Sequence, residues 1–224
     1  MDYDRAPPMP VDQYRTTQHA IPGLNGLYDA ARAIIEATTT DGARILVVGA
    51  GGGREIESLG GSDRRFDITG VDPSADMLAL ATQYRRDAQV SLIKGLVDDL
   101  PGNAAFDAAT SFLVMHFIRH ETEKLAFLRA IRRRPKQGAT YLHADLSLSG
   151  VAAFDQIAPA FIAHAKIVGL DAIAVPATAA IAAMLDGRVI GEAATAALFE
   201  ASGFAPVEPF FCGLWYAGWW TRAV

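Results

Sequence analysis

A glycine-rich turn is the feature of this sequence best suited to binding a ligand. Ile45 to Val48 form a short, continuous apolar run that leads directly into residues 49–53, which read G-A-G-G-G. Such a run is typical of a buried parallel strand. Glycine can take positive φ and has no Cβ to obstruct a ligand. The turn therefore predicts close approach of a bound molecule to the backbone.

The spacing of these glycines separates two kinds of nucleotide site. Gly49, Gly51 and Gly53 match G-x-G-x-G, but Arg54 stands where the dinucleotide pattern G-x-G-x-x-G requires a small residue. That residue lets the helix pack closely on the strand in dinucleotide-binding proteins. Arg54 therefore counts against a nicotinamide-dependent oxidoreductase.

A carboxylate ends the next predicted strand. Asp72 follows Gly53 by 19 residues and closes the run Asp67–Asp72. A carboxylate at this place can accept hydrogen bonds from both hydroxyls of a ribose. It could instead favour the dipole of the following helix, although Ser74 is available as the cap. We expect Asp72 to bind ribose.

One histidine follows the fourth predicted strand at the edge where open α/β sheets bind ligands. His116 is our candidate general base, because an ordinary histidine pKa near 6.5 suits that role. A structural histidine on a loop is the alternative. Asp145, at the end of the fifth predicted strand, lies at the same ligand-binding edge, and capping or hydrogen bonding to loop amides explains its position equally well.

The elements that position these residues alternate in type. Apolar strands are expected at 45–48, 67–72, 90–93, 106–112 and 140–146, with helices at 54–59, 75–86 and 121–134 between them. This alternation is typical of a parallel sheet with helices on both faces. The sequence therefore predicts an α/β, Rossmann-like, doubly wound sheet of seven strands.

The last third departs from this alternation. Residues 150–185 read as two or three helices without a strand between them, and 192–201 as one more helix ended by Gly203. The runs 205–212 and 214–222 read as an antiparallel pair at the sheet edge, which makes the last strand antiparallel. We expect one domain over residues 1–224, with a helical arm at 1–40 and a helical cap insertion at 150–187.

Three segments together resemble the successive motifs of class I S-adenosylmethionine-dependent methyltransferases. They are the glycine turn, Val71–Leu78 (VDPSADML) and Gly95–Pro101 (GLVDDLP). The resemblance covers residues 45–147. It implies S-adenosylmethionine as the cofactor and methyl transfer as the activity.

The resemblance also implies where the cofactor lies. The turn glycines would lie against its methionine part, Asp72 and Pro73 against ribose and adenine, and Met77 on the adenine ring, although Met77 also suits an ordinary helix core. The expected cofactor-binding residues are Tyr14, Arg15, Gly49, Ala50, Gly51, Gly53, Asp72, Pro73, Met77, Val97, Asp98 and Phe112.

One position departs from the family pattern. The third motif often reads G-D, but Leu96 stands in place of the acid. Asp98, helped by the backbone of Val97, is the expected substitute near the adenine amine. Phe112–Phe117 occupies the stretch that flanks the methyl-donor sulfur in this family, which also favours His116 as the base.

A narrower resemblance links the chain to a bacterial subgroup akin to the carboxy-S-adenosylmethionine synthases. Tyr14, Arg15, the run Ile21–Leu24 and the C-terminal Gly213–Trp220 are among the residues that carry it. In that subgroup the N-terminal arm closes over the cofactor, so Arg15 would pair with its carboxylate; a surface ion pair is the alternative. The synthases place an arginine shortly before the final helix. Residues 177–183 hold none, and Arg188 comes later than expected.

Composition excludes several other classes. The 224 residues carry 20 Lys+Arg against 25 Asp+Glu, a net charge of −5 that is unsuited to gripping nucleic acid. The single cysteine, Cys212, permits no internal disulfide, and we expect a reducing cytoplasm. Mean hydropathy is +0.18, but charges interrupt every apolar run, so we expect no membrane segment. The five histidines lack metal-site spacing, so we expect no metal.

Methyl transfer to an O, N or C nucleophile of a small-molecule acceptor is therefore the expected function. Carboxy-S-adenosylmethionine synthesis and non-catalytic cofactor binding are the alternatives. The sequence does not define the oligomeric state, but an aromatic edge strand bearing Trp215, Trp219 and Trp220 could pair or pack with another subunit in a homodimer.

Overall fold

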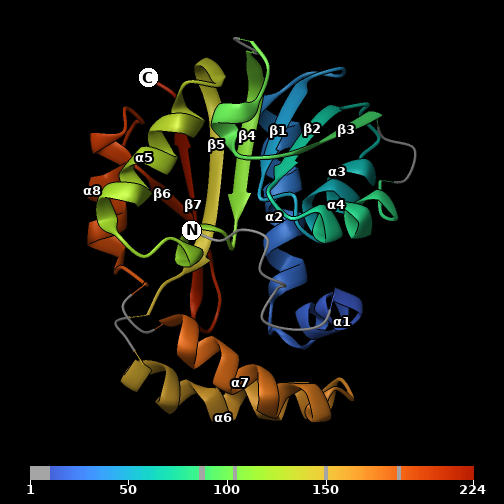
Figure 1. Cartoon of the computed structure of the whole chain (residues 1–224), viewed down its shortest axis with the longest axis vertical. Helices are drawn as coiled ribbons and strands as arrows, with labels where there is room; N and C mark the ends of the chain where they lie inside the picture. Colours follow the sequence, from blue (N-terminus) through green and yellow to red (C-terminus); the bar gives the residue numbers. More distant parts are fainter. Residues whose placement is uncertain (1–10, 86–88, 103–104, 149–150, 186–187) are drawn as a thin grey trace.

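The computed structural model describes residues 11–85, 89–102, 105–148, 151–185 and 188–224, in which seven strands form one sheet. Their spatial order is β3-β2-β1-β4-β5-β7-β6 (Figure 1). The first five strands run parallel, and β7 runs antiparallel to both of its neighbours. The strands are β1 (Arg44–Val48), β2 (Asp67–Asp72), β3 (Gln89–Lys94), β4 (Phe106–Phe112), β5 (Pro135–Leu146), β6 (Glu208–Cys212) and β7 (Tyr216–Arg222). The expected doubly wound sheet with an antiparallel last strand is confirmed.

Helices cover both faces of the sheet. Successive residues of β1 alternate between two cores, so Ile45 packs with α2, α3 and α4, while Leu46 packs with α5 and α8. The helices are α1 (Val11–Ala20), α2 (Leu24–Thr38), α3 (Arg54–Gly60), α4 (Ala75–Thr82), α5 (Glu121–Arg132), α6 (Val151–Ile167), α7 (Asp171–Leu185) and α8 (Glu192–Ala201), with short 3₁₀ turns η1 (Val97–Asp99) and η2 (Met115–Phe117). Strands buried on both faces explain the continuous apolar runs of the sequence.

Helices α1, α6 and α7 lie beyond the carboxyl ends of the parallel strands (Figure 1). Phe154 and Phe161 of α6 pack edge-on against Trp215, and this contact joins the hairpin of α6 and α7 to the sheet. His164 of α6 hydrogen-bonds through Nδ1 to the carbonyl of Ala20 in α1, at 3.1 Å. These helices lie where we expected the arm and the cap. Residues 1–10, 149–150 and 186–187 of those two segments lie outside the described residues.

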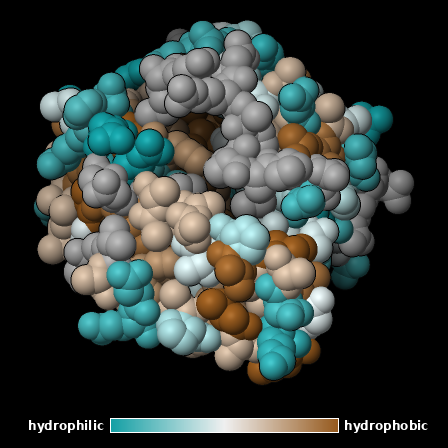
Figure 2. Space-filling view, turned by 60° about the horizontal axis from the view of Figure 1, so that its bottom comes forward, coloured by the Kyte–Doolittle hydropathy of each residue, from teal (hydrophilic) through white to brown (hydrophobic). Residues whose placement is uncertain are grey.

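Apolar side chains gather on the outer face of this helical layer, which Figure 2 views from below. Ile167, Val168 and Val175 are 82%, 44% and 62% exposed. None of the helices in the described ranges is long and apolar enough to cross a membrane.

The expectation that the tryptophans mark an edge strand is wrong. Strand β7 lies between β5 and β6, so β6 forms the edge of the sheet. Trp215 and Trp219 are only 2% and 5% exposed because they pack on α6 and on His143. They stabilise the chain's own core, whereas Trp220 is half-buried.

Two element boundaries also differ from expectation. Helix α4 ends at Thr82 because the chain tightens there, with the amides of Gln83 and Tyr84 bonding to carbonyls three residues back; Arg86 lies outside the described residues. Strand β5 begins at Pro135, five residues early, since Pro135 pairs with Phe106 across an irregularity in the register.

Candidate active site

The glycine turn joins β1 to α3 and takes the backbone conformation that glycine allows. Gly49, Gly51 and Gly53 have φ values of +73°, +44° and +78°. The amides of Gly49 and Ala50 donate to the carbonyl of Val71, at 2.8 and 3.1 Å, which fixes the turn beside the end of β2. The turn and Asp72 therefore belong to one rigid unit.

The three glycines have different neighbours. A Cβ on Gly51 would lie 3.6 Å from Met77 Cε and 3.9 Å from Asp72 Oδ2. A Cβ on Gly49 would overlap the side chain of Val114. Gly53 instead faces helix α4, where a Cβ would lie 2.8 Å from the Cα of Ala81. The expected contact of Gly53 with the cofactor therefore has a competing explanation, which is close packing of the turn on α4.

We predict that Gly53→Ala destabilises the protein by about 2 kcal/mol more than Gly42→Ala. Both residues have positive φ, +78° and +75°, so both substitutions carry a backbone cost of about 1–2 kcal/mol. Only Gly53 also forces a clash with backbone, since nothing lies within 4 Å of a Cβ on Gly42. Urea denaturation measures both. Equal losses would show that packing on α4 does not require this glycine.

Asp72 ends β2 with its carboxylate held by two backbone amides. Oδ2 accepts from Gly51 N and Oδ1 from Ser74 N, both at 2.9 Å. Burial raises the pKa of this carboxyl although both hydrogen bonds oppose the shift, and the residue is 9% exposed. The cap of α4 is Ser74, whose Oγ accepts from Met77 N. Asp72 is therefore not the cap, and each of its oxygens can accept one further donor.

A small cavity lies in front of the turn. Arm helix α1 contributes Tyr14 and Gln18 to its wall, and burial raises the pKa of Tyr14 to about 12, with Asp72 and Glu55 adding to the shift. The lining residues are Tyr14, Gln18, Tyr28, Gly49, Ala50, Gly51, Gly52, Arg54, Glu55, Phe112 and Leu113. The structure thus brings together five of the expected cofactor-binding residues: Tyr14, Gly49, Ala50, Gly51 and Phe112.

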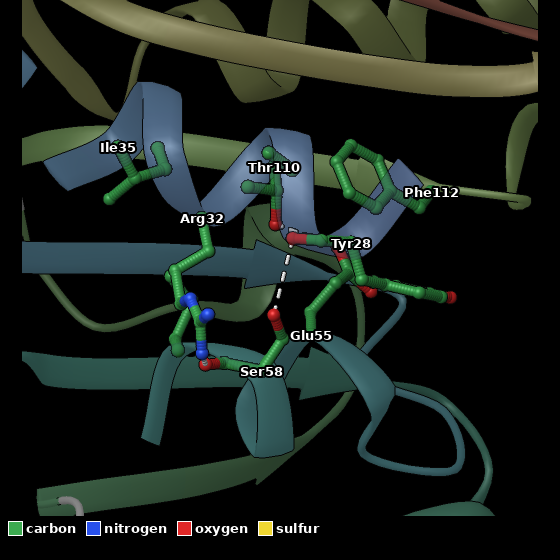
Figure 3. Close-up of a pocket in the computed structure, with 9 residues that line it drawn as sticks. Tyr28, Arg32, Ile35, Glu55, Ser58, Thr110 and Phe112 are labelled. Atoms are coloured by element: carbon green, nitrogen blue, oxygen red, sulfur yellow. Dashed lines mark hydrogen bonds between the residues drawn. The ribbon is translucent and has the colours of Figure 1, made fainter. Parts of the chain in front are cut away.

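A second small cavity shares part of its lining with the first (Figure 3). Tyr28, Glu55 and Phe112 line both cavities. The sequence analysis missed Glu55 and Tyr28. The available signal was an acid two residues after the last glycine of the turn, but nothing local shows that this acid is buried.

Two other expected residues, Arg15 and Asp98, do not line this cavity. Arg15 is 8% exposed; its guanidinium pairs with Glu57, lies over the Tyr84 ring at 3.9 Å and points one nitrogen at the Gly52 carbonyl, at 3.5 Å. Asp98 is exposed and pairs with Arg133 at 2.7 Å.

Two more of the expected residues, Val97 and Pro73, do not line the cavity in front of the turn. Val97 is buried in the core on the α5 side, and its carbonyl accepts from Arg134 at 2.7 Å. Pro73, between Asp72 and Ser74, is half-buried.

The segment after β4 connects this cavity to His116. Leu113 has a φ of +59°, the one positive value at a non-glycine position among the described residues, and its amide donates to the Ala144 carbonyl at 2.7 Å. Such conformations cost energy and cluster at functional sites. Val114 packs on Gly49, and His116 follows two residues later.

His116 and Asp145 form a buried pair. Asp145 accepts from the His116 amide at 3.0 Å and from His116 Nδ1 at 2.6 Å, and the two side chains are 6% and 5% exposed. Burial alone would raise the pKa of Asp145, but the neighbouring His116 and the hydrogen bonds from His116 and Leu146 hold it below its ordinary value. An ionised carboxylate only accepts, so Nδ1 carries the proton and Nε2 is the open nitrogen. Nε2 has no hydrogen-bond partner within the described ranges.

A buried lysine, which was not among the residues expected from the sequence, holds the turn that carries His116. Lys124 is 1% exposed and donates from Nζ to the Met115 carbonyl at 2.7 Å. Burial lowers its pKa, Asp145 opposes this, and the positive charge of Arg188 adds to it. These charges fix η2 at the carboxyl end of β4. No cluster of three metal-ligating side chains occurs in the parts of the chain that the structure describes.

Comparison with known proteins agrees with this geometry. Residues 46–143 match the family model described as a methyltransferase domain. No curated protein matches the chain significantly. Many solved structures do, however, at low sequence identity.

Three of these structures illustrate the likeness. A magnesium protoporphyrin IX methyltransferase from Synechocystis PCC 6803 with bound S-adenosylhomocysteine has 15% identity and a TM-score of 0.65, and the match covers 95% of this chain and 94% of that one. A methyltransferase from Aquifex aeolicus has 15% identity and a TM-score of 0.62, with 98% and 100% covered. A phosphoethanolamine N-methyltransferase from Haemonchus contortus has 17% identity and a TM-score of 0.61, with 89% and 42% covered.

The family match spans the glycine turn, Asp72 and His116, and the sheet has the strand order of the fold that these neighbours share. Residues 46–143 thus match a methyltransferase domain, and the solved structures that share this fold include a methyltransferase with S-adenosylhomocysteine bound.

Proposed function

We propose that this protein transfers the methyl group of S-adenosylmethionine to an O, N or C nucleophile of a small-molecule acceptor, with His116 as the general base. The observation that carries the proposal is the His116–Asp145 pair. It is buried at the carboxyl ends of β4 and β5, two residues from the side chain that packs on the glycine turn.

The residues present fit the cofactor. Gly49 and Gly51 leave the backbone open along the cavity, and the Asp72 carboxylate has acceptor capacity left for a pair of hydroxyls. Gln18 Oε1 and Arg54 Nε are buried without a hydrogen-bond partner in that cavity wall, so the wall has polar groups to offer a ligand. Asp72 would hold the ribose, with Met77 and Pro73 beside the adenine.

Bound S-adenosylmethionine supplies an electrophilic methyl group, so the protein mainly has to align the acceptor, exclude water and remove a proton. Asp145 fixes the His116 ring with Nδ1 protonated, which leaves Nε2 free to take the acceptor's proton. The α7 helix lies close to η2, which carries His116, so the cap would select the acceptor.

Acceptor choice is open to test with radiolabelled cofactor. The similar structures include a porphyrin methyltransferase and a phosphoethanolamine methyltransferase, so a panel of small carboxylates, phenols and amines is the appropriate range. We expect label in at least one acceptor class, and at least about 100-fold slower labelling with His116→Ala. Tight S-adenosylhomocysteine binding without transfer to any acceptor would instead support a non-catalytic binding protein.

One observation favours a second candidate, a carboxy-S-adenosylmethionine synthase-like enzyme. Arg188 Nε is buried without a hydrogen-bond partner. The positive charge of Arg188 contributes to the lowered pKa of Lys124, the lysine that holds the His116 turn. An arginine there would suit an extra carboxylate on the donor. Mass spectrometry of the ligand that co-purifies distinguishes the two: a carboxylated cofactor supports the synthase, and an ordinary one supports methyl transfer.

We also propose that residues 1–224 act as one domain in the cytoplasm, with 1–40 and 150–187 closing over the acceptor. The contacts of α1 with α4, α6 and α7 support this. A homodimer, if formed, would use surfaces other than Trp215 and Trp219.

A further inference from the structure

Glu55 is a buried carboxylate without a cation. It is the second residue of α3 and is 5% exposed. One oxygen accepts from Thr110 Oγ1 at 2.7 Å (Figure 3). No Lys or Arg forms an ion pair with it in the described part of the chain. A carboxylate buried in this way is costly unless a ligand or partner compensates it.

The groups around Glu55 disfavour its negative charge. Burial raises the pKa of Glu55 to about 8, Asp72 adds to the shift, and the bond from Thr110 opposes it. At neutral pH this carboxyl is therefore mostly protonated. The only titratable group among the described residues whose charge acts on Glu55 is Asp72 of β2, and the charge of Glu55 in turn raises the pKa values of Tyr14 of α1, Tyr28 of α2 and Tyr141 of β5. Arg54, its neighbour in the chain, lines the same cavity.

Two further polar groups of the same cavity lack partners. Gln18 Oε1 and Arg54 Nε are both buried without a hydrogen bond. The terminal nitrogens of Arg54 are engaged by Asn25 and by Glu57, which leaves Nε–H as the guanidinium donor without a partner. The wall therefore offers two acceptors, from Glu55 and Gln18, and one cationic donor.

This set complements an ammonium and a carboxylate carried on one carbon. An ammonium has three donors and suits the acceptors, while the carboxylate accepts from the guanidinium. Gly49 and Gly51, whose backbone the methionine part is expected to follow, line the same cavity.

We propose that Glu55 is the ligand for the α-ammonium group of the cofactor's methionine part, with Arg54 Nε beside the α-carboxylate. This rests on the proposed function, which places the cofactor along the glycine turn. When the ammonium binds, Glu55 gives up its proton to solvent and becomes the counter-ion. Binding thus exchanges a buried neutral acid for a buried ion pair.

The test is calorimetry with two probes, S-adenosylhomocysteine and 5′-methylthioadenosine, which lacks the amino-acid part. Glu55→Gln keeps the shape and the bond from Thr110 but cannot carry charge. We expect it to weaken S-adenosylhomocysteine binding about 10- to 100-fold at pH 8 and to leave methylthioadenosine binding unchanged. Glu36→Gln, on the outer part of α2, is the matched control and is expected to change neither.

Proton release gives a second readout that a purely structural role would not move. Titrations in buffers of different ionisation enthalpy at pH 7 should show nearly one proton released when the wild type binds S-adenosylhomocysteine, and clearly fewer with Glu55→Gln. The wild-type affinity should rise with pH up to about 8, because the free carboxyl must lose its proton.

Each outcome is decisive. Unchanged affinity and proton release in Glu55→Gln would overturn this inference while leaving the proposed function intact. Failure of the wild type to bind either probe would overturn the proposed function itself. Equal weakening for both probes would show that Glu55 supports the turn and does not read the ammonium.

Discussion

Asp72→Asn is expected to bind S-adenosylhomocysteine at least about 100-fold more weakly than the wild type. Each oxygen of Asp72 already accepts one backbone amide and has capacity for one ribose hydroxyl. An amide nitrogen cannot accept, and it would face the amide of Gly51 or Ser74 donor to donor. Hydrogen bonds to a charged group contribute roughly 1.5–3 kcal/mol each, and neutral ones about 1 kcal/mol. The variant loses one hydroxyl bond outright and leaves the other neutral, which predicts a drop of about two orders of magnitude.

The control for this variant is Asp76→Asn, which removes the same charge from an exposed position in the first turn of α4. Isothermal titration calorimetry measures both, and a thermal melt shows whether the turn survives. Comparable affinity of Asp72→Asn and wild type would remove ribose binding from Asp72 and leave it a structural acceptor for the turn.

His116→Ala is expected to lower kcat by about 10²- to 10⁴-fold, the usual contribution of a positioned general base. Asp145→Asn should approach the same loss, because an amide no longer fixes the ring with Nδ1 protonated. Neither residue lines the cavity in front of the turn, so S-adenosylhomocysteine affinity should stay within a few-fold of wild type. A loss in kcat with retained product binding is the signature of chemistry rather than folding.

His120 supplies the matched control four residues further on. It is exposed and makes no side-chain cap on α5. His120→Ala should keep wild-type activity. If His116→Ala kept full activity on an acceptor that the wild-type protein methylates, the base assignment would be wrong. Alignment alone would then drive the transfer.

The sheet and its order of elements were predictable because their signals are local. The run Ile45–Val48, the turn that follows it and the carboxylate Asp72 each carry their meaning within a few residues, and parallel strands place their carboxyl ends together. The family resemblance then added the cofactor. Gly203 likewise ends α8 with a φ of +88°, as expected.

Other parts of the site depend on contacts between distant residues. Glu55 meets Thr110 across 55 positions, and His116 meets Asp145 across 29. No local pattern shows that these acids are buried or which partner they take. The sequence therefore does not distinguish the two roles of Asp145, and it gives no sign that Glu55 belongs to the site.

The tryptophan-bearing strand was misplaced for a related reason. Its aromatic residues suit an edge that packs on another chain and also suit a core that receives helices from a distant insertion. The structure shows the second arrangement, because α6 places Phe154 and Phe161 against Trp215. Strand order within an antiparallel pair is not encoded in the pair's own composition.

A crystal structure with S-adenosylhomocysteine bound tests the central claim most directly. The account predicts both ribose hydroxyls on the Asp72 carboxylate, the amino-acid end along Gly49 and Gly51, and the sulfur facing the segment that carries His116. Density for the ligand with its ribose away from Asp72, or with His116 Nε2 turned from the sulfur, would contradict the account.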